Sequence, residues 1–388
     1  MPDSASTSPG QSSPIRVMIV DDSIVVRGFV TRWLRAEEGI EVVASHSSAR
    51  RALEDLEAAD PDIVLLDVEM PDMDGITALP LLHAKKPDLP IVIVSTVTLR
   101  NAEISMRCLA LGAVDCLAKP QSSTDTNTAA DFRRELVSRV RTLGVHKPGR
   151  PRRAPSAPAA ARPAEAKPAD APLPRPEPLH RASEPTTLRP FSLIPPRVLL
   201  IGSSTGGPQA LADLLAGLRS VVTRVPVLIT QHMPPAFTTI LAEHLSRVAG
   251  VPAHEPTHGE PIKAGTIYVA PGGKHMKIAA QDRKEITAVL TDDPPVNYCK
   301  PAVDPLFQSA VPIWGNAACA VVLTGMGADG ARGALSVAEA GGSVIAQDEA
   351  TSVVWGMPGA TAHIGACSAI LPLPEIAPRL VRLFGGRS

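Results

Sequence analysis

Three segments of the chain carry side chains that together could perform nucleophilic catalysis. In "RVLLIGSSTGGPQAL" (197–211), an apolar run stops at a glycine, and two serines and a glycine pair follow it. A serine beside glycines at the end of a strand resembles in logic, although not in spacing, the nucleophile turn of G-x-S-x-G enzymes. The segment lacks the GK[ST] ending of a P-loop and does not match GxGxxG, so a nucleotide-binding turn is disfavoured.

Two further segments supply partners for such a serine. His232 follows the apolar run in "VLITQHMPPAF", and Asp329 follows the run in "AVVLTGMGADGARGAL". A serine hydroxyl needs a base within hydrogen-bond reach, and a carboxylate can orient an imidazole base. The glycines around Met326 leave backbone N–H groups free to face an oxyanion. The three segments predict a serine hydrolase site, although each residue alone has an ordinary role in a turn or helix cap.

A second group of residues combines carboxylates with a hydroxyl and an ammonium. Asp21 and Asp22 follow one apolar run, and Asp67 follows another. Carboxylates forced together repel one another unless a cation joins them, and oxygen ligands suit Mg²⁺. Ser95 and Lys119 end two further apolar runs. Such a set neutralises the charge of a phosphoryl group, so we expect Asp67 to accept one.

The apolar runs predict the elements that position the acidic group. Before residue 120, five short runs alternate with helix-like stretches, at 17–20, 40–44, 63–66, 91–94 and 113–117. Apolar strands alternating with helices are typical of a parallel sheet covered on both faces. We therefore predict a doubly wound, five-stranded, flavodoxin-like α/β domain, with the acidic residues at the carboxyl ends of its strands, where ligands collect.

The C-terminal half shows the same alternation. Its apolar runs lie at 198–201, 225–230, 317–324 and 342–347, and each adjoins a helical pattern. Residues 266–290 instead suggest an antiparallel excursion with turns at 271–273 and 281–284. We predict a second parallel-sheet α/β domain with a β-hairpin insertion.

A proline-rich segment separates the two halves. Fourteen of the forty prolines fall between residues 148 and 196, mixed with Ala, Arg, Glu and Ser. Such a composition cannot form a packed core and favours a disordered, extended spacer. The predicted organisation is an N-terminal domain at 15–143, a linker at 144–194 and a C-terminal domain at 195–385.

Composition excludes several classes of protein. No apolar run approaches the roughly 18 residues of a membrane helix, and the N-terminus lacks a secretory signal, so we expect a cytoplasmic protein without membrane insertion. The five cysteines are dispersed and form no CxxC pair, which disfavours disulfides and zinc. A net charge of −1 argues against a nucleic-acid partner.

Residues 15–143 resemble the receiver domain of two-component response regulators. The resemblance rests on "VDDS", "LDVEMPDMDG" and "KP". It implies that a sensor histidine kinase is the phosphodonor and that Asp67 is the phosphoacceptor. It further implies Mg²⁺ held by Asp21, Asp22, Asp67 and the carbonyl of Glu69, and phosphoryl contacts from Ser95 and Lys119.

Residues 195–385 resemble the catalytic domain of chemotaxis protein-glutamate methylesterases. The resemblance rests on seven segments, "IGSSTGG", "ITQHMP", "VAPGGKHM", "PPVN", "AVDPLF", "LTGMGADG" and "GMPGA". It implies Ser204 as nucleophile, His232 as base and Asp329 as the third member. Backbone donors near Met326 and Thr205 would stabilise the oxyanion.

The resemblance also implies a substrate and a form of regulation. The enzyme would hydrolyse glutamate γ-methyl esters on the helical domain of a chemoreceptor, and would deamidate glutamine, without a metal for either reaction. An unphosphorylated receiver would cover the Ser204 cleft. Because a long linker lowers the effective concentration of that contact, we expect weaker basal inhibition than in a relative with a short linker.

Three features depart from the family pattern. The linker is longer than we expect for the family, Tyr298 and Cys299 stand where the family commonly has Arg and His, and Gly273 stands where an acidic residue is frequent.

Two other classes of protein remain as alternatives. One alternative is a phosphorylation-controlled binding module whose second domain has lost hydrolysis. The other is a DNA-binding regulator, for which the second domain offers no basic recognition helix.

Overall fold

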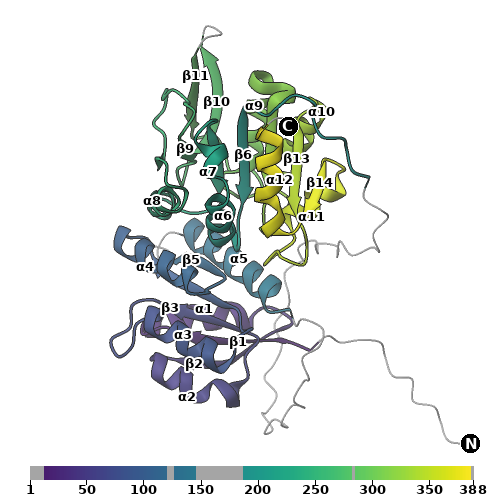
Figure 1. Cartoon of the computed structure of the whole chain (residues 1–388). Coiled ribbons are helices and arrows are strands. Elements are labelled where there is room, and N and C mark those ends of the chain that lie inside the picture. The colour runs from purple at the N-terminus through teal and green to yellow at the C-terminus, as the bar shows by residue number, and fades with distance from the viewer. Residues whose placement is uncertain (1–12, 120–125, 146–186, 282–284, 386–388) are drawn as a thin grey trace, which may run out of the picture.

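A computed structural model describes residues 13–119, 126–145, 187–281 and 285–385. They form two α/β domains that lie against each other, with the N-terminal domain in purple and blue and the C-terminal domain in teal to yellow (Figure 1). Most of the predicted linker, residues 146–186, lies outside the described residues. No helix in the described ranges combines the length and the apolar character needed to cross a membrane.

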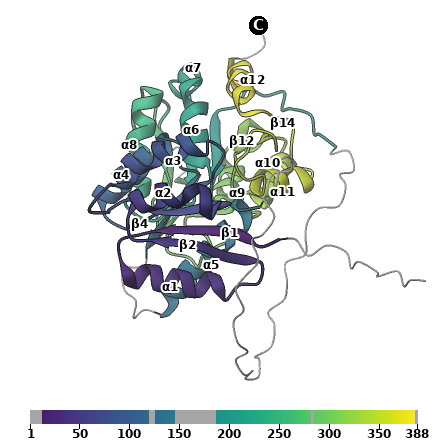
Figure 2. The ribbon, with the colours of Figure 1, turned by 90° about the horizontal axis from the view of Figure 1, so that it is seen from below.

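The N-terminal domain is the predicted doubly wound sheet. Its five strands pair in parallel in the order β2-β1-β3-β4-β5. Figure 2 shows α1 and α5 on one side of this sheet and α2, α3 and α4 on the other. In chain order the elements are β1 (Ile15–Val20), α1 (Ile24–Arg35), β2 (Ile40–His46), α2 (Ala49–Ala59), β3 (Ile63–Asp67), α3 (Gly75–Lys85), β4 (Ile91–Thr96), α4 (Leu99–Ala110), β5 (Asp115–Lys119) and α5 (Thr126–Leu143).

Each strand of this sheet is apolar because helices cover both faces. One core lies between the sheet and α1 and α5, where Val30 and Leu136 are buried. The other lies between the sheet and α2, α3 and α4, where Leu56, Leu79 and Met106 are buried. This double burial explains why apolar runs, rather than alternating patterns, marked the strands.

The C-terminal domain holds a seven-stranded sheet in the order β14-β13-β12-β6-β7-β9-β8. All of its strand pairs are parallel. Its strands are β6 (Val198–Ser203), β7 (Val227–Gln231), β8 (Ala253–His254), β9 (Ile267–Val269), β12 (Ala318–Val322), β13 (Ser343–Gln347) and β14 (Ala369–Leu371).

Helices cover both faces of the second sheet as well. Buried residues of α6, α7, α8 and α12 form one core, and those of α9, α10 and α11 form the other. The helices are α6 (Gly207–Ala216), α7 (Arg219–Val222), α8 (Phe237–Ala249), α9 (Val303–Trp314), α10 (Ala331–Glu339), α11 (Met357–His363) and α12 (Leu373–Gly385), with a 3₁₀ turn, η1 (Gly315–Ala317), after α9.

The predicted hairpin insertion is present, but its start differs from the prediction. Strands β10 (His275–Gln281) and β11 (Glu285–Thr291) pair in antiparallel fashion. Strand β9, which we placed in the antiparallel excursion, instead pairs in parallel with β7 in the main sheet. All three residues of β9 are buried, so that the strand belongs to the core of the domain.

The end of the predicted linker is bonded to the C-terminal domain. The backbone N–H of Arg189 donates to the carbonyl of Cys367 at 2.8 Å, and its Nε donates to the carbonyl of Gly365 at 2.7 Å. The backbone N–H of Ser192 donates to the hydroxyl of Ser343 at 3.1 Å. These contacts fix the residues that lead into β6.

Candidate active site

The serine turn joins the end of β6 to the start of α6. The backbone N–H of Ser204 donates to the carbonyl of Thr324 at 3.0 Å, which ties the turn to the segment after β12. Gly206 adopts a left-handed conformation with φ of 75°, which glycine tolerates without strain. A side chain on Gly207 would lie 2.1 Å from Oε1 of Gln231, so glycine is required for the close packing there. The two glycines therefore make the turn possible.

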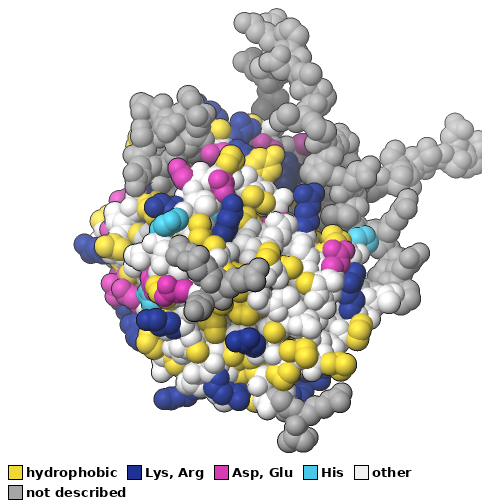
Figure 3. Space-filling view, turned by 90° about the horizontal axis from the view of Figure 1, so that it is seen from above, with side chains coloured by type: hydrophobic (Ala, Val, Ile, Leu, Met, Phe, Trp, Pro, Cys, Tyr) yellow, Lys and Arg dark blue, Asp and Glu magenta, His cyan; other side chains and the backbone are white. Residues whose placement is uncertain are grey.

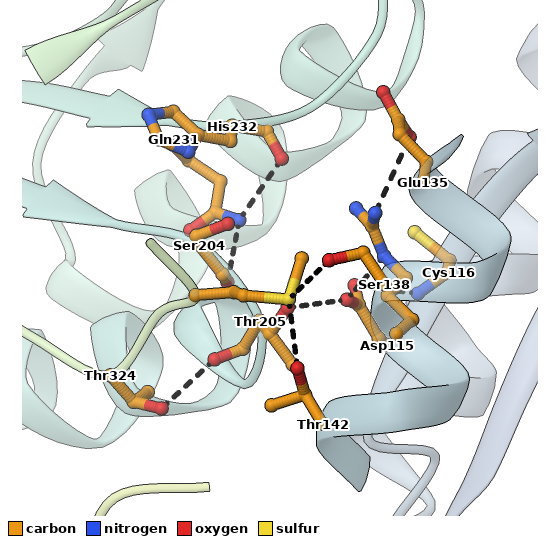
Figure 4. A network of polar contacts seen from close by, with 12 residues as sticks. Asp115, Cys116, Glu135, Ser138, Thr142, Ser204, Thr205, Gln231, His232 and Thr324 are labelled. Carbon is orange, nitrogen blue, oxygen red and sulfur yellow. Dashed lines mark hydrogen bonds and ion pairs between the residues drawn. The ribbon is translucent and has the colours of Figure 1, made fainter. Parts of the chain in front are cut away.

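Gln231 fixes the serine turn against the strand that carries His232. Its Oε1 accepts from the hydroxyl of Ser203 at 2.6 Å, and its Nε2 donates to the carbonyl of Ser204 at 2.9 Å and, more weakly, to that of His232 at 3.4 Å. Figure 4 shows this side chain between Ser204 and His232. Sequence reasoning missed Gln231, because nothing in "VLITQHMP" separates it from an ordinary strand residue.

His232 and Asp329 form a buried pair at the same edge of the sheet. The imidazole Nε2 and Oδ2 of Asp329 are 2.7 Å apart, with side-chain exposures of 8% and 2%. The carboxylate also accepts the backbone N–H of Val303 at 2.6 Å. Burial raises the pKa of Asp329, but the hydrogen bond and charge of His232, together with the backbone N–H groups of Val303 and Asp304, outweigh burial and lower the pKa overall. Asp329 is therefore ionised, and a carboxylate in this contact can orient an imidazole.

Cys299 is the second neighbour of the imidazole. Its thiol is one of the groups that raise the pKa of His232, whereas no hydrogen bond joins the ring to the hydroxyl of Ser204 within the described ranges. Burial lowers the pKa of His232, but Cys299 and Asp329 outweigh burial and raise it to about 10. A ring that carries this proton must lose it before it can act as a base.

The predicted oxyanion donors lie on the two segments that flank Ser204. Within the described part of the chain, no protein acceptor takes up the backbone N–H of Thr205 or of Met326. Thr205 is buried and Met326 is half-buried. A side chain on Gly325 would lie 2.8 Å from Cβ of Ser204, so the segment before Met326 passes close to the nucleophile. Both N–H groups are therefore available to a developing negative charge.

The N-terminal domain contacts the serine turn directly. Oγ1 of Thr205 donates to Oδ2 of Asp115 at 2.7 Å, and the backbone N–H of Gly206 donates to the carbonyl of Val114 at 3.2 Å. Asp115 also accepts from Nε of Arg139 at 2.9 Å. Figure 4 shows Asp115 reaching from the N-terminal domain to Thr205, beside Ser204. Ser204 is 5% exposed, so a protein substrate cannot reach it in this arrangement.

Helix α5 contacts two further segments of the candidate site. The hydroxyls of Ser138 and Thr142 donate to the sulfur of Met326 at 3.3 Å and 3.2 Å. The guanidinium of Arg134 lies 4.8 Å from the ring centroid of Tyr298. The N-terminal domain thus contacts the nucleophile turn, the Met326 segment and the loop that carries Cys299.

A second candidate site lies at the carboxyl edge of the N-terminal sheet. Nζ of Lys119 is 2.7 Å from Oδ2 of Asp21 and 2.7 Å from Oδ2 of Asp67. Burial raises the pKa of Asp67 to about 6, although Lys119 opposes this shift. Burial lowers the pKa of Lys119, but the two carboxylates outweigh burial and raise it, so its ammonium stays charged.

The other predicted residues of this site do not all lie beside Asp67. Asp22 lies with Asp21 and Asp67, and their ligand atoms lie within 4.8 Å of one another. The backbone N–H of Glu69 donates to Oδ1 of Asp67 at 3.4 Å, while its side chain accepts from Asn101. Ser95 is instead turned toward Ser105, whose hydroxyl donates to it at 3.2 Å. Among the residues that the structure describes, no hydrogen bond joins Ser95 to the aspartates.

This set of donors fits a divalent cation. Three carboxylates within reach of one ion supply the hard oxygen ligands that Mg²⁺ prefers. Two of the three are buried, and the negative charge of Asp21 contributes to the raised pKa of Asp67, so a cation would relieve their repulsion.

Two family models match the chain, one over each domain. The family described as CheB methylesterase matches residues 199–380, and the response regulator receiver domain matches residues 17–131. The chain is 53% identical over 382 residues to a protein-glutamate methylesterase/protein-glutamine glutaminase of Nitrobacter hamburgensis, which covers 98% of this chain and 97% of the relative. A relative of the same description from Rhodopseudomonas palustris, of its group 2 operon, is 54% identical over 99% of this chain and 97% of its own length.

Solved structures resemble the domains separately. The CheB methylesterase catalytic domain of Thermotoga maritima matches with 37% identity and a TM-score of 0.46, over 48% of this chain and 98% of its own. The response regulator domain of the CheB from the same organism matches with 32% identity and a TM-score of 0.32, over 35% of this chain and 99% of its own. The relatives that match nearly the whole length place the chain in the family of protein-glutamate methylesterase/protein-glutamine glutaminases, with a receiver domain ahead of the CheB methylesterase domain.

Proposed function

We propose that the chain hydrolyses γ-methyl esters of glutamate on the helical domain of a methylated chemoreceptor, under control of its receiver domain. The observation that carries this proposal is the buried His232–Asp329 pair, at the edge of the sheet where the Ser204 turn also lies. A hydroxyl, an imidazole and a carboxylate are the groups that acyl transfer requires, and the proposal needs the Ser204 hydroxyl to come within hydrogen-bond reach of His232 during the reaction.

The proposed reaction proceeds through an acyl-enzyme. Nδ1 of His232 takes the proton of the Ser204 hydroxyl as its Oγ attacks the ester carbonyl, and Asp329 holds Nε2. The N–H groups of Thr205 and Met326 stabilise the tetrahedral oxyanion. Its collapse expels methanol, which receives the proton from His232, and water then hydrolyses the acyl-enzyme to release glutamate and restore Ser204.

The same groups support glutamine deamidation. Attack of Ser204 on a side-chain amide gives the same acyl-enzyme, and His232 gives its proton to the departing amide nitrogen, which leaves as ammonia instead of methanol. The test of both activities is the release of methanol from a methylated receptor and of ammonia from its unmodified form, with and without a small phosphodonor. Absence of methanol release by the phosphorylated wild type would refute the esterase proposal.

We assign control of this reaction to phosphorylation of Asp67 by a sensor histidine kinase. Asp21, Asp22, Asp67 and the carbonyl of Glu69 would hold Mg²⁺, which neutralises negative charge on a transferring phosphoryl group. Lys119 supplies a second positive charge, and Ser95 would have to turn away from Ser105 to contact the phosphoryl group. With these proposed partners, the reaction would take place in the cytoplasm.

Replacing Asp67 by asparagine should abolish stimulation by acetyl phosphate and Mg²⁺ while leaving basal methanol release unchanged. The amide cannot form the acyl phosphate, although it fills the same space. In the wild type, acidification should weaken stimulation and more Mg²⁺ should oppose this loss, because burial raises the pKa of Asp67 and a bound cation would lower it. Asp72→Asn, an exposed change nearby, is the control. Equal stimulation of both variants would contradict the assignment.

The activity of the phosphorylated enzyme should rise with pH across the neutral range, because only a neutral His232 accepts the serine proton. Replacing Cys299 by alanine removes one of the contacts that raise the pKa of His232. The ascending limb of the pH profile of kcat/KM should therefore move to lower pH, with severalfold higher activity at pH 7. Cys299→Ser, which keeps a polar neighbour, should move the limb less. An unchanged limb in both variants would contradict this prediction.

DNA binding has less support than ester hydrolysis. The face of the C-terminal domain seen in Figure 3 mixes Lys and Arg with Asp and Glu and shows no continuous basic surface there. The net charge of the chain, −1, likewise gives no overall attraction to phosphates. Gel-shift experiments with the phosphorylated protein test this alternative.

A further inference from the structure

Asp304 is a buried carboxylate that the proposed reaction does not use. It lies in the first turn of α9, with 4% of its surface exposed. One of its oxygens accepts the backbone N–H of Gly333, in the first turn of α10, at 2.7 Å, and the carboxylate also accepts the N–H of Gly330. Burial raises the pKa of Asp304, and the charge of Asp329 adds to this shift. A group that is costly to bury is therefore retained at the start of these two helices.

Asp329 makes the reciprocal contacts. It precedes α10 and accepts the backbone N–H groups of Val303, at 2.6 Å, and Asp304, at 3.2 Å, in the first turn of α9. The first turn of each helix thus donates to a carboxylate from the other segment, Asp329 before α10 and Asp304 within α9. The residues at the N-cap positions, Ala302 and Gly330, have no side chain that could accept these N–H groups.

Close packing of the two helices makes this exchange possible. A Cβ on Gly333 would lie 2.7 Å from Cβ of Phe307 and 3.2 Å from the backbone of Asp304. A Cβ on Gly330 would lie 2.9 Å from Cγ1 of Val303. Any residue larger than glycine at these positions would push α10 away from α9, and would lengthen the bonds between the carboxylates and the N–H groups.

We propose that Asp304 is a positioning residue that holds Asp329 in place against the imidazole of His232; the inference rests on the proposed esterase function. The carboxylate of Asp329 binds the imidazole with the same oxygen that caps α9, so its orientation depends on where α10 starts relative to α9. Asp304 also fixes the position of α10 relative to α9, because its carboxylate on α9 accepts the N–H of Gly333 on α10. Without Asp304, the first turn of α10 loses an acceptor and the residue before it is free to shift.

The test compares two variants of Asp304 with a variant on the same helix. Asp304→Ala should lower kcat about tenfold, with KM nearly unchanged, because small displacements of catalytic groups are costly. The His232 titration, followed by NMR of the histidine ring, should move to lower pH. Asp304→Asn should stay within about threefold of the wild type, since its amide oxygen still accepts from Gly333. Ser309→Ala also loses an acceptor, for the N–H of Ile278 at 3.0 Å, but lies away from Asp329 and should leave the titration unchanged.

The outcomes separate this inference from the proposed function. An unchanged His232 titration in Asp304→Ala, or an equal loss of kcat in Asp304→Asn, would overturn the positioning role. Should Asp304→Ala fail to fold, Gly333→Ala displaces the same helix without removing a carboxylate and should shift the same titration. A wild type without esterase activity would refute the proposed function, while the NMR titration would still report whether Asp304 positions Asp329.

Discussion

Replacing Ser204 by alanine is expected to lower the turnover number for methanol release by about 10⁴-fold or more. Alanine keeps the turn, since the backbone N–H of Ser204 and its carbonyl make the bonds to Thr324 and Gln231. Only the attacking oxygen is lost. The remaining activity would come from water, assisted by His232 and the oxyanion donors, which explains why a residual rate above the uncatalysed reaction persists.

The neighbouring serine provides the matched control. Ser203 is fully buried and donates its hydroxyl to Gln231 at 2.6 Å. Ser203→Ala removes that bond, which is worth about 1 kcal/mol in stability, and should lower turnover by only a few-fold. Methanol release from a methylated receptor, in the presence of a phosphodonor, measures both variants. If Ser203→Ala were the inactive variant and Ser204→Ala the active one, the nucleophile would be misassigned.

The same variant separates an enzyme from a binding module. A module that only docks a partner in response to phosphorylation would keep its cellular output without the Ser204 hydroxyl. An esterase loses its output while the receiver is still phosphorylated on Asp67. Phosphorylation of Ser204→Ala therefore has to be measured together with methanol release.

The strands that sequence could predict are those buried on both faces. Apolar runs marked β1 to β5 because helices cover each side of that sheet. Strands β8 and β14, with two and three residues, are too short to produce a run, and both lie at the edges of the second sheet. We predicted β9 as part of the hairpin because its own sequence does not show whether it pairs in parallel with β7 or in antiparallel fashion with a neighbouring strand.

The candidate sites could be predicted because strand ends of a parallel sheet meet at one edge. That rule brought Asp21, Asp67 and Lys119 together in one domain, and it placed His232 near Asp329 in the other. The rule does not predict which ring nitrogen of His232 contacts the carboxylate of Asp329. Contacts such as that of Asp115 with Thr205 join residues 90 positions apart and depend on how the domains pack, which no local pattern reports.

The second large effect is expected at that interdomain contact. Asp115→Ala should raise basal methanol release, without a phosphodonor, roughly 10- to 100-fold. The bond from Thr205 is 2.7 Å long, and both residues are buried. A buried hydrogen bond to a charged group contributes about 1.5–3 kcal/mol, which corresponds to this range in the ratio of closed to open forms.

A long linker predicts a smaller rise in basal methanol release. The free energies of the linker and of the interdomain contact decide which prediction holds. The length of the linker alone predicts weak basal inhibition, hence a small rise. Each doubling of a flexible connection costs only about 0.6 kcal/mol, however, which is less than one buried charged hydrogen bond. Packing of α4 against α6 and α8, and the bonds from α5 to Met326, add to the contact. We therefore expect the interface to dominate, and a rise below about threefold would show that the linker does.

A double-mutant cycle can assign the rise to the bond itself. Thr205→Val removes the hydroxyl but keeps the backbone N–H, so it should raise basal release to a similar extent, and the double variant should add little to either change. Glu135→Ala is the control, because it breaks only an ion pair with Arg139 within α5, at 3.4 Å, and should leave basal release unchanged. Saturating acetyl phosphate should bring the wild type and Asp115→Ala to one rate, since phosphorylation and the substitution populate the same open form. If the double variant raised basal methanol release by the product of the two single effects, Asp115 and Thr205 would act separately. Asp115 would then hold the closed form through Arg139 rather than through Thr205.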